Sequence, residues 1–421
     1  MNGVGIECVL TSCNTFDNVA GPVVRITGYP CDHTRKVRRM TTEVQGTTDP
    51  RFDKVRAMLA DNLESRSELG ASLCVDVDGK KVVDLWGGYA DPARTRPWAG
   101  NTIVNVWSST KLVTNLAALV LVDRGLLDLN APVARYWPEF GQNGKGDIEV
   151  RHILSHTSGV SGWETPWTIE DMYDWERSTT QLARQAPWWE PGSASGYHSQ
   201  NQGQLVGEIV RRISGAPLRD FVRTELAEPL AADFQIGVQP VDDDRVAEIV
   251  PPPPADFDLS SVPPDSPMVK TFTGPVGNAN AANTIAWRRA DMGAHNGHAN
   301  ARAMATMMSA VSCGGTANGV SILSPKTIDK IFQEQARGID LVLGIPLRWG
   351  MGFALPEPAS MPAIPDGDER ICFWGGWGGS MTVMHPDRGV TISYVMNKMG
   401  PGIIGSDRSN AYIAAVYEAL A

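Results

Sequence analysis

A serine and a lysine stand three residues apart in the segment Asn-Val-Trp-Ser-Ser-Thr-Lys, at Ser108 and Lys111. On a helix, positions i and i+3 share a face, so the Lys111 amine can reach back to the Ser108 hydroxyl. A serine hydroxyl is a weak nucleophile at neutral pH, and a neighbouring base makes it reactive. The pair therefore predicts a nucleophile with its base. The same spacing arises by chance about once in a chain of this length, usually as a solvated helix face, so the rest of the sequence must decide.

Two further motifs follow the pair in chain order, Tyr197-His198-Ser199 and Trp374-Gly375-Gly376. By itself Tyr197 would be interpreted as a half-buried aromatic residue. The competing motifs are weaker. His152 and His156 stand four apart but lack the metalloprotease glutamate, and a structural role for His156 is favoured.

Apolar periodicity indicates how the elements position these motifs. A helix is predicted from Ser108 to Arg124, ending at Gly125, which places Ser108 at or near a helix N-terminus. An earlier helix over Asp53 to Leu69 precedes a hairpin over Ala71 to Tyr89 that turns at Asp78-Gly79. Further helices are expected at 150–155, 200–214, 218–226, 298–311, 325–335 and 409–420, and strands at 347–355, 370–385 and 389–397.

Strands at both ends of the chain and helices in its middle predict an α/β domain interrupted by an α domain. We expect residues 1–48 to be an extension outside the core, 49–107 with 275–421 to form the sheet domain, and 108–274 to form a mostly helical domain. The stretch 251–267 holds seven prolines in seventeen positions, so it is predicted to be a crossing loop.

Composition excludes several classes of protein. With 37 basic and 47 acidic residues, the formal charge of −10 opposes binding to nucleic acid or an anionic membrane. The basic cluster at 35–39 is interpreted as solvated chain. The longest apolar run, Leu112 to Val122, is too short to span a bilayer. The six cysteines have no zinc spacing, which favours reduced thiols in a cytoplasmic protein.

The order and spacing of the three motifs resemble the serine β-lactamase and penicillin-binding-protein superfamily, and most closely its class C-like family VIII carboxylesterases. The resemblance covers roughly residues 50–420. It is supported by Leu154-Ser-His-Thr-Ser-Gly159, Trp189-Glu-Pro-Gly192 and Gly297-His298-Ala299. It implies a β-lactamase-like fold, with an antiparallel sheet flanked by helices, an inserted mostly helical domain, and the active site in the cleft between them. It implies no metal or cofactor.

The resemblance also assigns roles. Lys111 and Tyr197 would share the duty of base, with Lys111 held partly neutral by burial and the helix N-terminus. Tyr197 would exchange a proton with Ser108 and pass it to the leaving alcohol. The backbone amides of Ser108 and Trp377 would form the oxyanion hole.

Two departures from the β-lactamase pattern bear on the substrate. Trp374-Gly375-Gly376 stands where those enzymes carry Lys-Thr-Gly, whose lysine attracts a carboxylate, and Ser199 stands where they carry asparagine. An indole has a large apolar face and no charge, so neutral esters are favoured. We expect the substrate to be contacted by Trp374, Gly375, Gly376, Trp377, Ser199 and His298.

These features predict a serine esterase that acts on small neutral esters, short-chain or small aromatic, through an acyl-enzyme on Ser108. The enzyme alternatives are a β-lactamase or D-alanyl peptidase, a lactonase or amidase, and an acyltransferase. The alternative outside enzymes is an inactive ligand-binding homologue. The expected partner is a small-molecule ester, and a homo-oligomer is compatible with the sequence.

Overall fold

An antiparallel sheet of nine strands, in the order β1-β3-β2-β14-β13-β12-β11-β10-β9, dominates the computed structural model, which describes residues 43–254 and 259–421. The strands are β1 (Gln45–Thr48), β2 (Gly70–Val77), β3 (Lys80–Gly88), β9 (Ala336–Ile339), β10 (Pro346–Trp349), β11 (Ala354–Leu355), β12 (Cys372–Gly375), β13 (Met381–His385) and β14 (Val390–Met396). Segments from both ends of the chain therefore share one sheet.

The local sequence explains the centre of this sheet. Asp78 and Gly79 both have positive φ, 50° and 76°, as the tight turn between β2 and β3 requires. β14 is rich in β-branched and aromatic residues, is buried along its length, and pairs with β2 and β13. A strand that is buried on both faces needs a cover on each side.

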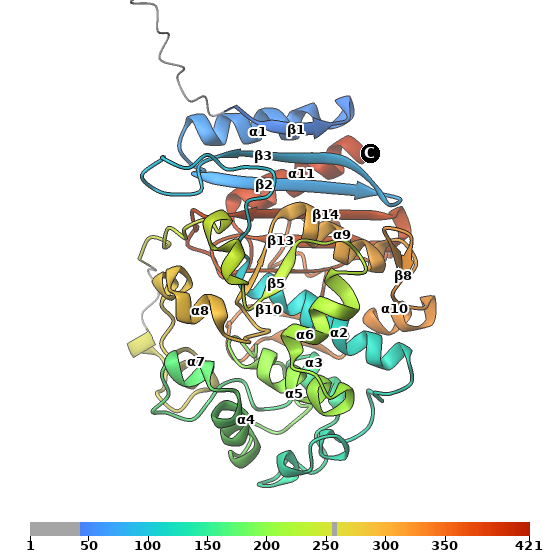
Figure 1. The fold of residues 1–421 in the computed structure, drawn as a ribbon. Helices are drawn as coiled ribbons and strands as arrows, with labels where there is room; N and C mark the ends of the chain where they lie inside the picture. The colour runs from blue at the N-terminus through green and yellow to red at the C-terminus, as the bar shows by residue number, and fades with distance from the viewer. Residues whose placement is uncertain (1–42, 255–258) are drawn as a thin grey trace, which may run out of the picture. The chain divides into compact units, whose positions relative to one another are not determined.

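Helices supply that cover. α9 (Ala301–Ser312) packs on β2, β13 and β14. α1 (Asp53–Glu64) and α11 (Asp407–Leu420) pack on each other and contact β3 and β14 respectively. Around β14, α9 and α11 lie on opposite faces of the sheet (Figure 1).

The middle of the chain is mostly helical, as predicted, and its helices gather at the end away from β1 (Figure 1). They are α3 (Val150–Leu154), α4 (Trp175–Arg184), α5 (Gln202–Ser214), α6 (Leu218–Val222), α7 (Pro267–Thr273) and α8 (Ile285–Arg289), with α10 (Pro325–Ile331) following later. α2 (Thr110–Asp123) contacts α5 and α6 as well as α9, so the helix that starts at the nucleophile joins the helices to the sheet.

A small three-stranded sheet braces the entry to α2. It consists of β4 (Val104–Asn105), β6 (Gly297–Ala299) and β5 (Phe234–Ile236), with β6 in the middle. Because β4 runs directly into the segment of Ser108, the segment around β6 is held beside the nucleophile. A separate pair, β7 (Thr316–Ala317) and β8 (Val320–Ser321), forms a short hairpin.

The predicted antiparallel sheet flanked by helices is confirmed, and some predicted boundaries are wrong. The extension predicted to reach residue 48 ends earlier, because Gln45–Thr48 pairs with β3 as an edge strand. The helix predicted from His298 begins at Ala301, since Gly297–Ala299 is strand β6. The strand predicted over 347–355 is two strands, β10 and β11, joined by a turn.

The described residues, 43–254 and 259–421, form one compact unit, and the predicted division into sheet and helical domains stays a prediction. The basic cluster at 35–39 and the cysteines Cys8, Cys13 and Cys31 lie outside the described residues. No helix in the described part of the chain combines the length and the apolar character that crossing a bilayer requires.

Candidate active site

The nucleophile candidate lies on a short 3-10 turn, Trp107–Ser109, that leads directly into α2. Ser108 Oγ lies 3.2 Å from Lys111 Nζ, so the predicted pair is brought together within one helical turn. The preceding residue, Trp107, has a φ of 51°, a backbone conformation that bulky L-residues rarely adopt. Such strain often marks a functional site, and here it stands next to the serine.

Lys111 is 1% exposed, and its Nζ donates to the carbonyl oxygens of Ser199 (2.6 Å) and Ala294 (2.9 Å). No carboxylate of the described residues forms an ion pair with it. Burial therefore lowers the pKa of Lys111 well below its usual range. A neutral amine has two N–H groups and one lone pair. Because the two carbonyls take both hydrogens, the lone pair is left for the Ser108 hydroxyl.

Tyr197 is fully buried on the loop before α5 and hydrogen bonds to Ser108. Its Oη accepts a hydrogen bond of 3.0 Å from Trp374 Nε1, and its ring centroid lies 4.8 Å from Lys111 Nζ. Burial raises the pKa of Tyr197 above its usual value. Burial thus shifts the pKa values of the two groups in opposite directions, and this favours the proton on the phenol and the neutral form of the Lys111 amine.

Asp340 holds Tyr197 in place and was not found by sequence reasoning. Its Oδ1 accepts from the backbone N–H groups of Tyr197 (2.9 Å), Val342 (3.0 Å) and Leu343 (3.0 Å). No motif marks this aspartate, which lies 143 positions after the tyrosine that it orients. Trp349 also holds Tyr197, because the two rings stack with their centroids 6.2 Å apart and an interplanar angle of 9°.

The histidines near Tyr197 are structural. The backbone N–H of His198 donates to His156 Nδ1 (3.0 Å), and the His198 ring contacts Ser158 Oγ (2.6 Å). Burial lowers the pKa of His198 to about 3, so the ring stays neutral. His152 Nδ1 accepts from the backbone N–H of Glu149 at 3.2 Å.

Among residues 43–254 and 259–421, no three potential metal ligands are gathered as a metal site would require.

The turn after β12 approaches the nucleophile closely. A Cβ on Gly376 would lie 2.4 Å from Val106 O and 2.4 Å from Ser380 Oγ, so only glycine fits here. Ser380 Oγ donates to the same Val106 oxygen at 2.8 Å. Within the described chain, the next amide, that of Trp377, donates to no protein acceptor. Its role beside the Ser108 amide as an oxyanion hole stays a prediction.

A cavity of about 470 Å³ opens onto Ser108. It is lined mainly by aromatic and aliphatic side chains, among them Trp107, Met268, Phe272, Trp287, Trp377 and Ile403. The polar residues on the wall are Ser108, Ser199, Gln200, Asn278 and His295. Among the described residues, no lysine, arginine, aspartate or glutamate lines it, so the cavity suits an uncharged ligand.

The predicted site residues divide into two groups. Ser108, Ser199 and Trp377 line the cavity, whereas Trp374, Gly375, Gly376 and His298 do not. Trp374 is 2% exposed and its ring contacts both Tyr197 and Trp349, so it meets the phenol and does not line the cavity as expected. His298 is in β6 opposite Asn105, where it supports the strand that precedes Ser108. Trp107 and His295 line the cavity and were missed.

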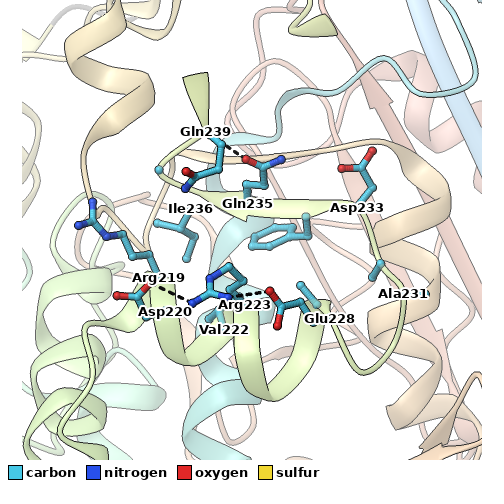
Figure 2. Close-up of a pocket in the computed structure, with 14 residues that line it drawn as sticks. Arg219, Asp220, Val222, Arg223, Glu228, Ala231, Asp233, Gln235, Ile236 and Gln239 are labelled. Atoms are coloured by element: carbon cyan, nitrogen blue, oxygen red, sulfur yellow. Dashed lines mark hydrogen bonds and ion pairs between the residues drawn. The ribbon is translucent and has the colours of Figure 1, made fainter. Parts of the chain in front are cut away.

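A second pocket, of about 390 Å³, lies between α6 and β5 (Figure 2). Three of its charged side chains are paired, because Arg223 lies 2.6 Å from Glu228 and 3.6 Å from Asp220. It contains no serine, cysteine or histidine. Chemistry by a nucleophile is therefore assigned to the cavity at Ser108.

A buried serine–lysine–tyrosine cluster beneath an antiparallel sheet defines a serine hydrolase of the β-lactamase fold, and comparisons with known proteins agree. The Beta-lactamase family model matches residues 55–415. The chain is 33% identical over 377 residues to the Esterase/beta-lactamase LipL of Mycobacterium tuberculosis, a match that covers 87% of this chain and 86% of the relative.

Two solved structures are similar over 90% of this chain and 100% of their own. One is a family VIII carboxylesterase, at 36% identity and a TM-score of 0.83. The other is a penicillin-binding-protein homologue from Caulobacter crescentus, at 38% identity and a TM-score of 0.81. The chain belongs to the Beta-lactamase family and is a serine hydrolase, and the resemblance noted in the sequence is confirmed.

Proposed function

We propose that this protein hydrolyses uncharged carboxylic esters through an acyl-enzyme on Ser108. One observation carries the proposal. The Ser108 hydroxyl lies 3.2 Å from a buried lysine amine that has no carboxylate partner among the described residues. It stands at the wall of a cavity whose described lining contains no charged side chain. The first feature supplies a base and the second selects neutral substrates.

In the acylation step, Ser108 Oγ attacks the ester carbonyl carbon while the Lys111 lone pair takes the hydroxyl proton. The ammonium that forms is held by the carbonyl oxygens of Ser199 and Ala294, which already accept its hydrogen bonds. The backbone N–H groups of Ser108 and Trp377 donate hydrogen bonds to the former carbonyl oxygen and stabilise its negative charge. One such donor is typically worth about 10²–10³ in rate.

When the tetrahedral intermediate collapses, its bond to the alcohol oxygen breaks and that oxygen takes the proton of Tyr197. The phenolate is stabilised by the Trp374 N–H and is reprotonated from the Lys111 ammonium. Water then attacks the acyl-enzyme with the same groups acting in reverse, which releases the acid and restores Ser108.

The cavity and the relatives support an ester substrate of modest size. A volume of about 470 Å³ falls within the range of small-molecule sites. One similar structure is described as a family VIII carboxylesterase. The described part of the cavity wall has no cation, which disfavours substrates that depend on a carboxylate, such as penicillins.

Replacement of Ser108 tests the proposal directly. The variant Ser108→Ala should lose turnover of short p-nitrophenyl esters and keep the wild-type melting temperature. A phosphonate ester should label the wild-type protein at Ser108, as located by mass spectrometry. The variant Ser109→Ala keeps the nucleophile and should still be labelled. Full activity in Ser108→Ala, or a label on another residue, would refute the assignment.

Hydrolysis of β-lactams is a second candidate, because LipL is described as both an esterase and a β-lactamase. A chromogenic cephalosporin measures it directly. We expect kcat/KM for this substrate to be far below that for a short ester, since no cation of the cavity wall binds its carboxylate.

A further inference from the structure

We propose that His295 binds the substrate, with its imidazole hydrogen bonded to an uncharged oxygen or nitrogen of the ester close to the bond that breaks. The inference rests on the proposed ester hydrolysis and goes beyond it, because it names a preference within neutral esters. Esters with a second polar atom beside the scissile group should be favoured over esters of pure hydrocarbon.

The first observation is an unsatisfied ring nitrogen. His295 lines the same cavity as Ser108 and is 5% exposed. Its Nε2 is buried and has no hydrogen-bond partner among the described residues. Buried polar atoms in proteins nearly always have a partner. The residue that carries this nitrogen lines the cavity, so we infer that the missing partner is a ligand.

The second observation is that the ring cannot turn away easily. His295 stacks on Trp287 with the centroids 4.9 Å apart and an interplanar angle of 23°. Trp287 is itself fixed, because its Nε1 donates to Asn105 Oδ1 at 3.0 Å. It also contacts Trp107 edge to face at 5.5 Å. The imidazole is thus oriented before any substrate arrives, which is the condition for selective binding.

The third observation ties the ring to the reacting groups. The residue before it, Ala294, accepts a hydrogen bond from Lys111 Nζ at 2.9 Å through its backbone carbonyl. The backbone N–H of His295 donates to Met292 O at 3.2 Å. The same short turn therefore positions both the base and the imidazole, so a group held by His295 lies beside the ester that Ser108 attacks.

The charge state of the ring decides what it can bind. Burial lowers the pKa of His295 to about 3. At neutral pH the ring is uncharged and has one N–H donor and one acceptor nitrogen. It can bind an ether, a hydroxyl or a carbonyl, and it offers no attraction to a carboxylate. A site that is built around such a bond rejects the analogue that lacks it.

Matched esters test the inference. On the acyl side, p-nitrophenyl butanoate is compared with p-nitrophenyl methoxyacetate, in which one CH₂ is replaced by oxygen. On the alcohol side, butyl acetate is compared with 2-methoxyethyl acetate. The variant His295→Phe keeps a flat ring on Trp287 and removes both nitrogens. For each pair, the ratio of kcat/KM on the ether ester to kcat/KM on the hydrocarbon ester is measured in the wild type and in the variant. The quotient of the wild-type ratio and the variant ratio cancels the intrinsic reactivity of each ester.

We expect this quotient to be about tenfold or more in at least one pair, the loss typical of a hydrogen bond with a buried partner. The variant His295→Gln, which regains a donor and an acceptor, should recover part of it. Phe272→Leu, which alters an apolar part of the same wall, should leave the quotient near one.

Two outcomes would overturn the inference while leaving the proposed function intact. A quotient near one in both pairs, with full activity, would show that the ring does not contact a polar substrate atom. An equal loss on ether and hydrocarbon esters would assign the imidazole to packing or to the hydrolytic water. A wild-type protein that is inactive on all four esters would overturn the proposed function and the inference together.

Discussion

The hydrogen bond from Trp374 Nε1 to Tyr197 Oη gives a sharp prediction about catalysis. The bond is 3.0 Å long and joins two fully buried groups. If Tyr197 gives its proton to the leaving alcohol, this N–H stabilises the phenolate that forms. Trp374→Phe removes the donor and keeps an aromatic ring, so it should lower kcat.

The size of the effect follows from the charge on the oxygen. A hydrogen bond to a neutral group is worth about 0.5–1.5 kcal/mol net, and one to a charged group about 1.5–3 kcal/mol. Because the phenolate exists only as the reaction proceeds, the larger value applies to the barrier. We expect kcat to fall by about 10- to 150-fold, with KM changed little.

Trp349→Phe is the matched control. Trp349 is also buried and stacks on the Tyr197 ring, but its Nε1 has no hydrogen-bond partner among the described residues. The two variants lose similar volume beside the same phenol, and only one loses a hydrogen bond. Steady-state kinetics on a p-nitrophenyl ester, with melting temperatures measured in parallel, compares them.

Two results would refute this argument. If Trp374→Phe raised KM and left kcat unchanged, the indole would be a substrate contact, as the sequence alone led us to expect. If both variants lost kcat equally, the effect would come from packing around Tyr197 and not from the N–H donor.

Three further predictions concern the groups that support the site. Because burial lowers the pKa of Lys111, the unfolded chain binds a proton that the folded chain lacks up to about pH 10.4. The free energy of unfolding should therefore rise with pH more steeply in the wild type than in Lys111→Met, by up to about 1.4 kcal/mol per pH unit in urea titrations. An equal slope in both would mean that Lys111 stays protonated. Asp340→Ala leaves three buried N–H donors without their acceptor and should cost about 1–3 kcal/mol of stability together with a loss of kcat. Asp340→Asn, which keeps an oxygen at the same place, should recover most of the stability and most of kcat. If Asp340→Asn were as unstable and as slow as Asp340→Ala, this prediction would be wrong. Gly376→Ala forces a Cβ to 2.4 Å from Val106 O and should lower the melting temperature and the esterase rate. Gly146→Ala, whose new Cβ would have its nearest neighbour at 3.6 Å, is the control that should change neither.

Local patterns in the sequence determined much of the fold. The helical spacing after Ser108 predicted α2, Asp78-Gly79 predicted the hairpin of β2 and β3, and the helix expected at 200–214 is α5. These features depend on neighbours within a few positions, so the sequence contains all the information that they need. Boundaries failed where a distant partner intervened, as when pairing with β4 and β5 made a strand of Gly297–Ala299.

The motifs also identified the groups most suited to chemistry, Ser108, Lys111 and Tyr197, because their types and order are visible in the chain. Tertiary structure decided how they are used. It buried Lys111 between two backbone carbonyls and away from any described carboxylate, which sets its charge. It turned Trp374 toward Tyr197 and away from the cavity.

The same packing brought Asp340 to the backbone of Tyr197 and His295 to the cavity wall, and no motif predicted either residue. The direction in which a side chain points, and its distance from water, depend on segments that meet only after folding. Residue types and spacing can therefore predict a nucleophile and its base. Burial, and the partners that each polar atom finds or lacks, decide the protonation states and the shape of the cavity that the substrate enters.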